Sequence, residues 1–153
     1  MTEYEAASLL ALGFGFLFLL FVFLLVFYIL GAIGLYSMAK RANVGNEWLA
    51  FIPIGNAYII GDLIDEKMKW FTIGKSGGIK LLIITIGTIV LNNIPVIGNI
   101  ISILFVIFWL VVFHWLFEKY SESAVILTIV NIITAGIASP FIIFALRNKE
   151  ARY

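Results

Sequence analysis

The chain has 153 residues, of which 63% are hydrophobic and 12% are charged, whereas a soluble domain is about 45–50% apolar and about 25% charged. A chain of this size has too little interior to bury so many large apolar side chains, so the composition excludes disorder, argues against a soluble enzyme and is typical of an integral membrane protein. The net charge is +1, cysteine is absent and His114 is the only histidine, so we expect no nucleic-acid partner, no metal site and no cofactor.

The first predicted element is an uncharged stretch from Ala6 to Tyr36. A helix of that length measures about 46 Å, at ~1.5 Å per residue, and crosses a hydrocarbon core of about 30 Å with length to spare. Because the preceding residues are acidic and the stretch exceeds the apolar region of a signal peptide, we predict a permanent transmembrane helix near residues 6–36. Its Phe-rich surface faces lipid in one interpretation. In the other, helices approach closely at Gly13, Gly15, Gly31 and Gly34.

A shorter apolar segment, near residues 48–61, has charged residues on both sides. Its centre carries Pro53 and Gly55, which interrupt helical hydrogen bonding. A straight span does not fit these residues, so we predict a re-entrant or interfacial pair of short helices.

The stretch between Lys80 and His114 contains no ionisable side chain, but Asn92-Asn93-Ile94-Pro95 interrupts it in its first third. The stretch is too long for one span and too short for two generous ones. We therefore predict a short segment near residues 81–91, followed by a full span near residues 94–117.

The last apolar segment, near residues 124–146, has the length of a full span and charged residues on both flanks. Asn131 lies inside it, with Thr128 and Thr134 about one helical turn to either side. Such a polar stripe is typical of a surface that joins helices. Pro140, preceded by Ser139, predicts a kink near the end of this span.

The Lys and Arg residues distinguish two topologies, because they favour the cytoplasmic side of a membrane. Five full spans would divide them equally between the two sides. If both short segments dip and return instead, nine of the ten lie on one side and Lys119 alone lies on the other. We therefore expect one all-α transmembrane domain over residues 1–153, with about three full spans and two re-entrant or interfacial segments. Its N-terminus would lie outside and its C-terminus in the cytoplasm; four or five spans are the alternative.

The two interruptions resemble one another, because residues 52–56 and 94–99 each read Ile-Pro, one or two β-branched residues, then Gly-Asn. The first also contains the pattern Trp-x-Ala-x-Ile-Pro-x-x-Asn, at Trp48, Ala50, Ile52, Pro53 and Asn56. With these residues the chain resembles a family of small uncharacterised bacterial multi-pass membrane proteins that have this pattern and a second Ile-Pro segment. The resemblance covers residues 35–146 and implies a location in the bacterial cytoplasmic membrane.

Four polar side chains in the apolar segments are candidate functional residues: Asn56, Asn99, Asn131 and His114. In one interpretation, two broken helices meet near the middle of the bilayer and present Asn56 and Asn99 to a pore or substrate. In the other, the backbone turns at Pro53, Gly55, Pro95 and Gly98, and the asparagines replace the lost hydrogen bonds. His114 fits a proton relay with Glu118 or an interfacial aromatic belt.

The sequence offers little basis for catalysis, because it shows no catalytic triad and no pair of acid and base carboxylates. Residues 74–78, Gly-Lys-Ser-Gly-Gly, lack the spacing of a phosphate-binding loop. We therefore predict a non-enzymatic membrane protein that acts through helix association with a partner or with itself, in an accessory, assembly or immunity-type role. The alternative is a small oligomeric channel or transporter that uses intramembrane asparagines at the broken helices.

Overall fold

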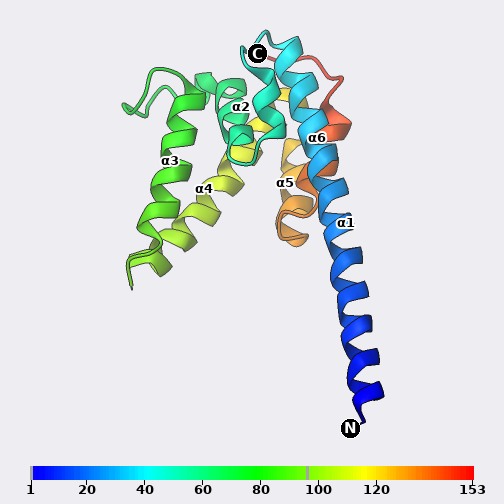
Figure 1. Ribbon diagram of the computed structural model, residues 1–153. Coiled ribbons are helices and arrows are strands. Elements are labelled where there is room, and N and C mark those ends of the chain that lie inside the picture. Colours follow the sequence, from blue (N-terminus) through cyan, green and yellow to red (C-terminus); the bar gives the residue numbers. More distant parts are fainter. Residues whose placement is uncertain (1, 96) are drawn as a thin grey trace.

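The computed structural model describes residues 2–95 and 97–153; Val96, which belongs to the second Ile-Pro interruption, lies outside them. The described residues form helices and turns without a strand, which confirms the all-α prediction (Figure 1). The helices, with 3-10 helices written η, are α1 (Glu3–Arg41), η1 (Glu47–Phe51), α2 (Gly55–Leu63), η2 (Asp65–Lys67), α3 (Gly77–Leu91), α4 (Ile97–Tyr120), α5 (Ala124–Ile133) and α6 (Ser139–Leu146).

Two helices are long and apolar enough to cross a membrane, over Ala7–Arg41 in α1 and Ile97–Tyr120 in α4. The segments expected near 6–36 and 94–117 form the greater part of them. A capping box starts α1: the Glu5 amide donates to Thr2 Oγ1 over 3.3 Å, and the Thr2 amide donates to Glu5 Oε2 over 2.7 Å. The chain turns away after Arg41, where Asn43 takes a left-handed conformation with φ 52°.

The C-terminal part of α1 packs closely on α6. A Cβ on Gly31 would lie 3.3 Å from Pro140 Cβ, so these two helices touch at a small residue. At Gly13 and Gly15, by contrast, no atom lies within 4 Å of such a Cβ. Close helix packing therefore occurs at the second pair of glycines in α1 and is absent, among the described residues, at the first.

The segment expected near residues 48–61 forms the pair of short helices η1 and α2, separated at Pro53. The following helix α3 begins beside the end of α2, where two aspartates accept hydrogen bonds from its first amides. Asp65 Oδ1 accepts from the Gly77 amide over 2.6 Å, and Asp62 Oδ1 accepts from the Gly78 amide over 2.7 Å. These bonds pair donors that a helix N-terminus leaves open.

The segment expected near 81–91 lies within α3. This helix runs away from the charged end of the molecule, where Glu66, Lys67, Glu118 and Lys119 lie, and a turn over residues 92–95 follows it (Figure 1). Helix α4 then returns to that end. Our expectation that Lys119 lies alone, on the side opposite the other Lys and Arg residues, is therefore wrong. Lys119 Nζ lies 2.7 Å from Glu66 Oε1, and Lys67 Nζ lies 3.0 Å from Glu118 Oε2, so Lys119 and Lys67 are at the same end.

The segment 124–146 is not one helix with a kink, as we expected, but two helices, α5 and α6, that run in opposite directions (Figure 1). The turn begins where Ala135 (φ 50°) and Gly136 (φ 87°) take left-handed conformations. The Gly136 amide donates to the Asn131 carbonyl over 2.8 Å, and the Ala135 amide donates to the Ile132 carbonyl over 3.0 Å, which is the Schellman pattern of a helix end. Pro140 therefore lies in the first turn of α6 rather than at a kink.

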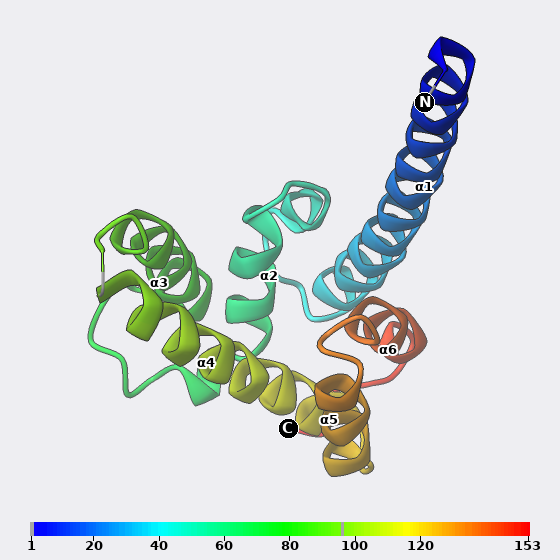
Figure 2. The same cartoon turned by 90° about the horizontal axis from the view of Figure 1, so that it is seen from below.

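The hydrophobic core lies just below the charged end, where the C-terminal parts of α1, α4 and α6 meet α2 and the start of α3. Its fully buried side chains include Met38, Ile59, Leu81, Leu116 and Phe117. Seen from below, α3 lies on one side of α2 and α1 and α6 lie on the other, while α4 runs from beside α3 to α5 (Figure 2). Away from the core the helices expose apolar side chains, as lipid-facing helices do.

Candidate intramembrane polar site

The structure does not bring Asn56 and Asn99 together. Asn56 is half-buried in the first turn of α2, which packs beside the start of α3. Asn99 is exposed in the first turn of α4, just after the turn that follows the end of α3. The two side chains therefore lie at different levels along α3, and the broken helices do not present them to one common point.

Each break is a tight turn in which a glycine allows two backbone segments to approach. A Cβ on Gly55 would lie 2.6 Å from the Leu49 carbonyl oxygen, and one on Gly98 would collide with the Asn92 carbonyl oxygen. The first turns of α2 and α4 thus pack against residues that precede Pro53 and Pro95, respectively. This geometry gives the shared Ile-Pro and Gly-Asn pattern a structural role.

At the second break the Asn93 side chain replaces a lost backbone hydrogen bond, and the Asn92 side chain binds a hydroxyl group on α4. Asn93 Nδ2 donates to the Ile89 carbonyl over 2.9 Å, which pairs an open carbonyl at the end of α3. Ser102 Oγ donates to Asn92 Oδ1 over 2.6 Å and joins α4 to this turn. Both asparagines belong to the Asn-Asn-Ile-Pro interruption of the sequence.

His114 joins α4 to α5 through Thr128. Its Nδ1 atom lies 2.8 Å from Thr128 Oγ1, and the Thr128 hydroxyl donates to the Ala124 carbonyl over 2.8 Å. Because the single hydroxyl hydrogen is used in that bond, His114 Nδ1 carries a hydrogen and donates to Thr128 Oγ1.

Glu118, which the sequence places one turn after His114, pairs with other residues. Its carboxylate forms the ion pair with Lys67 and accepts a hydrogen bond from the Tyr153 hydroxyl over 3.3 Å. These contacts raise the pKa of Lys67 above its ordinary value, chiefly through the hydrogen bond to Glu118. Glu118 therefore connects α4 to η2 and to the C-terminal residue Tyr153.

Asn131 is the most deeply buried of the four candidate side chains. It is 1% exposed, and its Oδ1 atom has no hydrogen-bond partner among the described residues. It lines a groove of about 460 Å³ between α4 and the tip of the α5–α6 hairpin. The α4 wall includes Phe105, Trp109 and Phe113. The groove thus has an aromatic wall on α4 and borders the buried Asn131 on α5.

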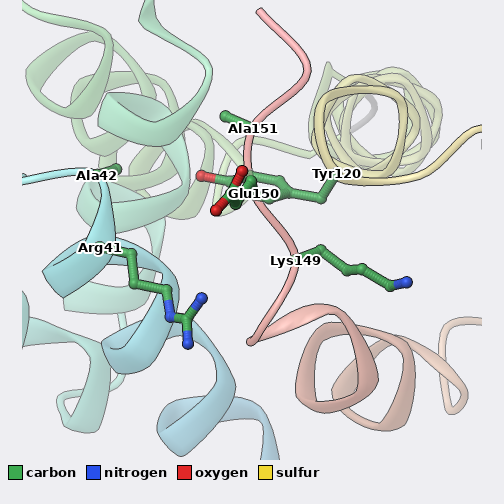
Figure 3. A pocket seen from close by; sticks show the side chains of 6 residues that line it. All are labelled: Arg41, Ala42, Tyr120, Lys149, Glu150 and Ala151. Carbon is green, nitrogen blue, oxygen red and sulfur yellow. The ribbon is translucent and has the colours of Figure 1, made fainter.

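A second pocket, of about 370 Å³, lies at the charged end and is lined by Arg41, Ala42, Tyr120, Lys149, Glu150 and Ala151. Arg41 Nη1 donates to the Asn148 carbonyl over 3.0 Å, so its guanidinium group is already engaged. Figure 3 shows the Lys149 side chain pointing away from that of Arg41. These charges of both signs do not converge on one ligand.

In residues 2–95 and 97–153, no group of three or more His, Asp or Glu side chains lies close enough together to hold a metal ion. Comparisons with protein-family models, with curated proteins and with solved structures find no match to this chain.

Proposed function

We propose that this chain is a small non-enzymatic multi-pass protein of the bacterial cytoplasmic membrane, which acts by associating through α1 with a partner helix or with a second copy. The observation that carries this proposal is the isolation of the N-terminal half of α1. Leu12, Phe14 and Phe18 are 71%, 70% and 69% exposed, and this part of the helix projects away from the other elements (Figure 1).

An isolated apolar helix in a bilayer gains stability when it packs on another helix, because van der Waals contacts form where small residues let backbones approach. Ser8, Ala11 and Gly15 lie on one face of this half, beside a shallow apolar depression that also includes Leu12 and Phe16. This face has the small side chains that close helix pairs use. The contacts of α1 with α6, by comparison, show that a glycine surface of the same helix already packs in this way.

The proposed topology has three crossings, by α1, α3 and α4, while α5 and α6 enter from the charged end and return to it. All ten Lys and Arg residues then lie on one side, which the positive-inside rule assigns to the cytoplasm. The N-terminus is outside and the C-terminus is cytoplasmic. Helix α3 rises only about 22 Å, which is several ångströms less than a hydrocarbon core of about 30 Å.

Disulfide cross-linking in native membranes tests the association, because the chain has no cysteine of its own. Cysteine replaces one α1 residue at a time from Leu9 to Val26, and Ile83→Cys on the exposed face of α3 is the matched control. We expect adducts that recur every three or four residues along α1 and include Gly15→Cys. The proposal would be overturned if no cysteine along α1 formed an adduct and the protein were monomeric and without a partner in mild detergent.

The alternative function, an oligomeric channel or transporter that uses the asparagines at broken helices, has less support in this geometry, because Asn56 and Asn99 are apart. Flux in proteoliposomes tests it directly. Flux that is lost in the double variant Asn56→Ala, Asn99→Ala would favour the channel over the association proposed above.

A further inference from the structure

We propose that the loop over residues 68–76, which joins η2 to α3, binds the anionic headgroup surface of the membrane. Lys69 and Lys75 contact lipid phosphates. Trp70 and Ile73 enter the interfacial layer of the bilayer beneath those phosphates. This inference rests on the topology proposed above, in which α3 crosses the bilayer, but it does not depend on the association of α1.

The 68–76 loop has the right position for such a contact. It leads directly into Gly77, the first residue of α3, and it projects to the side of that helix at the charged end (Figure 1). The end of a membrane-crossing helix lies at the level of the headgroups, where tryptophan is enriched because its ring is apolar and its N–H group is polar. The loop therefore lies beside lipid headgroups.

Two large apolar side chains of the loop are exposed. Trp70 is 67% exposed and Ile73 is 53% exposed. Phe71, by contrast, is half-buried and packs edge to face on Phe108 of α4, with ring centroids 6.1 Å apart. The Trp70 ring stacks on Phe71 with centroids 3.8 Å apart, so the exposed indole is supported by a ring that contacts α4. An exposed indole supported in this way is suited to the membrane interface.

The loop is held near both of its ends, so its exposed residues have a defined position. Met68 is fully buried, and its carbonyl accepts hydrogen bonds from the Lys80 ammonium group over 3.0 Å and from the Phe71 amide over 3.2 Å. Gly74 takes a left-handed conformation with φ 84°, and a Cβ there would lie 2.9 Å from Ile79 Cγ2. A loop that is already ordered loses little conformational entropy when it binds a surface.

The charges of the loop favour an anionic surface. Lys69 and Lys75 are exposed, and the loop contains no acidic residue. Within residues 2–95 and 97–153, neither of these lysines forms an ion pair. Other lysines close to the loop in sequence or in space are engaged within the protein: Lys67 with Glu118, Lys119 with Glu66, and Lys80 with the Met68 carbonyl. The two loop lysines are therefore available to lipid phosphates.

The acidic residues that precede the loop face other groups. Asp62 and Asp65 accept hydrogen bonds from the first amides of α3, where the helix dipole carries partial positive charge. Glu66 pairs with Lys119. These carboxylates therefore do not compete with lipid phosphates for the two loop lysines.

A spin label at a single cysteine tests the proposal, because the chain has no cysteine of its own. Thr72→Cys puts the label on an exposed position of the loop. The full chain is reconstituted in nanodiscs of phosphatidylcholine, with or without phosphatidylglycerol as the anionic lipid. Electron paramagnetic resonance then compares the access of lipid-soluble oxygen and of a water-soluble nickel complex to the label. We expect greater immersion of the label in the anionic bilayer, and a loss of this difference at about 1 M sodium chloride, where charges are screened within about 3 Å.

Three variants identify the residues responsible. Lys69→Gln combined with Lys75→Gln is expected to lower the ratio of immersed to water-exposed label in the anionic bilayer by about thirtyfold, which is about fivefold for each charge. Trp70→Ser should reduce immersion in both lipids. Lys40→Gln combined with Lys149→Gln is the matched control, because it removes two exposed charges elsewhere at the charged end and should leave the label immersed.

A label at Thr72→Cys that stays accessible to the nickel complex in the anionic bilayer would overturn the proposal and leave the loop to a soluble partner. Immersion that the control pair reduces as strongly as the loop pair would also overturn it. A label at Ile83→Cys, on the exposed face of α3, separates these results from a failure of the topology. It should lie in hydrocarbon in both lipids, and if it lies in water, the proposed crossing of α3 fails together with this inference.

Discussion

Gly34 of α1 lies directly against Ile143 of α6, so that a Cβ on Gly34 would be 2.8 Å from Ile143 Cγ2 and 2.9 Å from its carbonyl carbon. Because backbone atoms are part of the contact, a side-chain rotation cannot make room for a methyl group. We predict that Gly34→Ala destabilises the fold by about 1–3 kcal/mol, as overpacking does. Unfolding in detergent, followed by circular dichroism, measures the change.

Gly13→Ala is the control for that prediction, because a Cβ there meets no atom within 4 Å. It changes the same helix by the same methyl group and removes the flexibility of a glycine, so its stability should stay the same or rise slightly. If both variants unfold at the same point, the close contact between α1 and α6 does not exist.

The ion pair between Lys119 and Glu66 predicts that the loop after α4 and the loop before α3 face the same side of the membrane. Single cysteines at Ser121 and Lys75 should therefore react with an impermeant thiol reagent from one side. A cysteine at Ile94, in the turn between α3 and α4, should react from the other side. Labelling of the Ser121 and Lys75 positions from opposite sides would contradict the α3–α4 hairpin.

The two aspartates that cap α3 predict a local effect on its first turn. Asp62→Ala combined with Asp65→Ala removes the acceptors for the Gly78 and Gly77 amides, and each lost cap costs about 0.5–2 kcal/mol. Hydrogen exchange at the start of α3 should become faster, whereas the amides of α4 keep their protection. Glu122→Ala removes an exposed carboxylate at the same end of the molecule and should leave the exchange unchanged.

The raised pKa of Lys67 predicts a loss of stability at alkaline pH. Since the folded state holds the ammonium group beside Glu118, this contribution is complete below the ordinary pKa of 10.5 and disappears as the pH rises through the higher folded value. The unfolding midpoint of the wild type should fall toward that of Lys67→Gln in the pH range above 10.5. A difference between the two proteins that is constant over this range would contradict the ion pair.

Most helices and their ends can be predicted from the sequence, because hydropathy and proline affect the backbone of the same short segment in which they occur. The uncharged stretch before Tyr36 is one long helix, and the breaks at Pro53 and at Asn92–Pro95 are where the chain turns. The candidate site was less predictable. The polar stripe that Asn131 forms with Thr128 and Thr134 indicates this residue, but nothing in the sequence indicates that its Oδ1 atom lacks a partner or that Phe105 and Trp109 lie beside it.

Composition and local pattern are enough to predict that this chain is α-helical, that it has the composition of a membrane protein and that prolines and asparagines divide its apolar segments. The position of Lys119 beside Glu66 and the hairpin formed by residues 124–146 become clear only from the folded chain. Hydropathy does not distinguish them, because an apolar stretch has the same hydropathy whether it crosses a bilayer or returns. The choice depends on backbone conformation at Ala135 and on contacts between residues far apart in the chain.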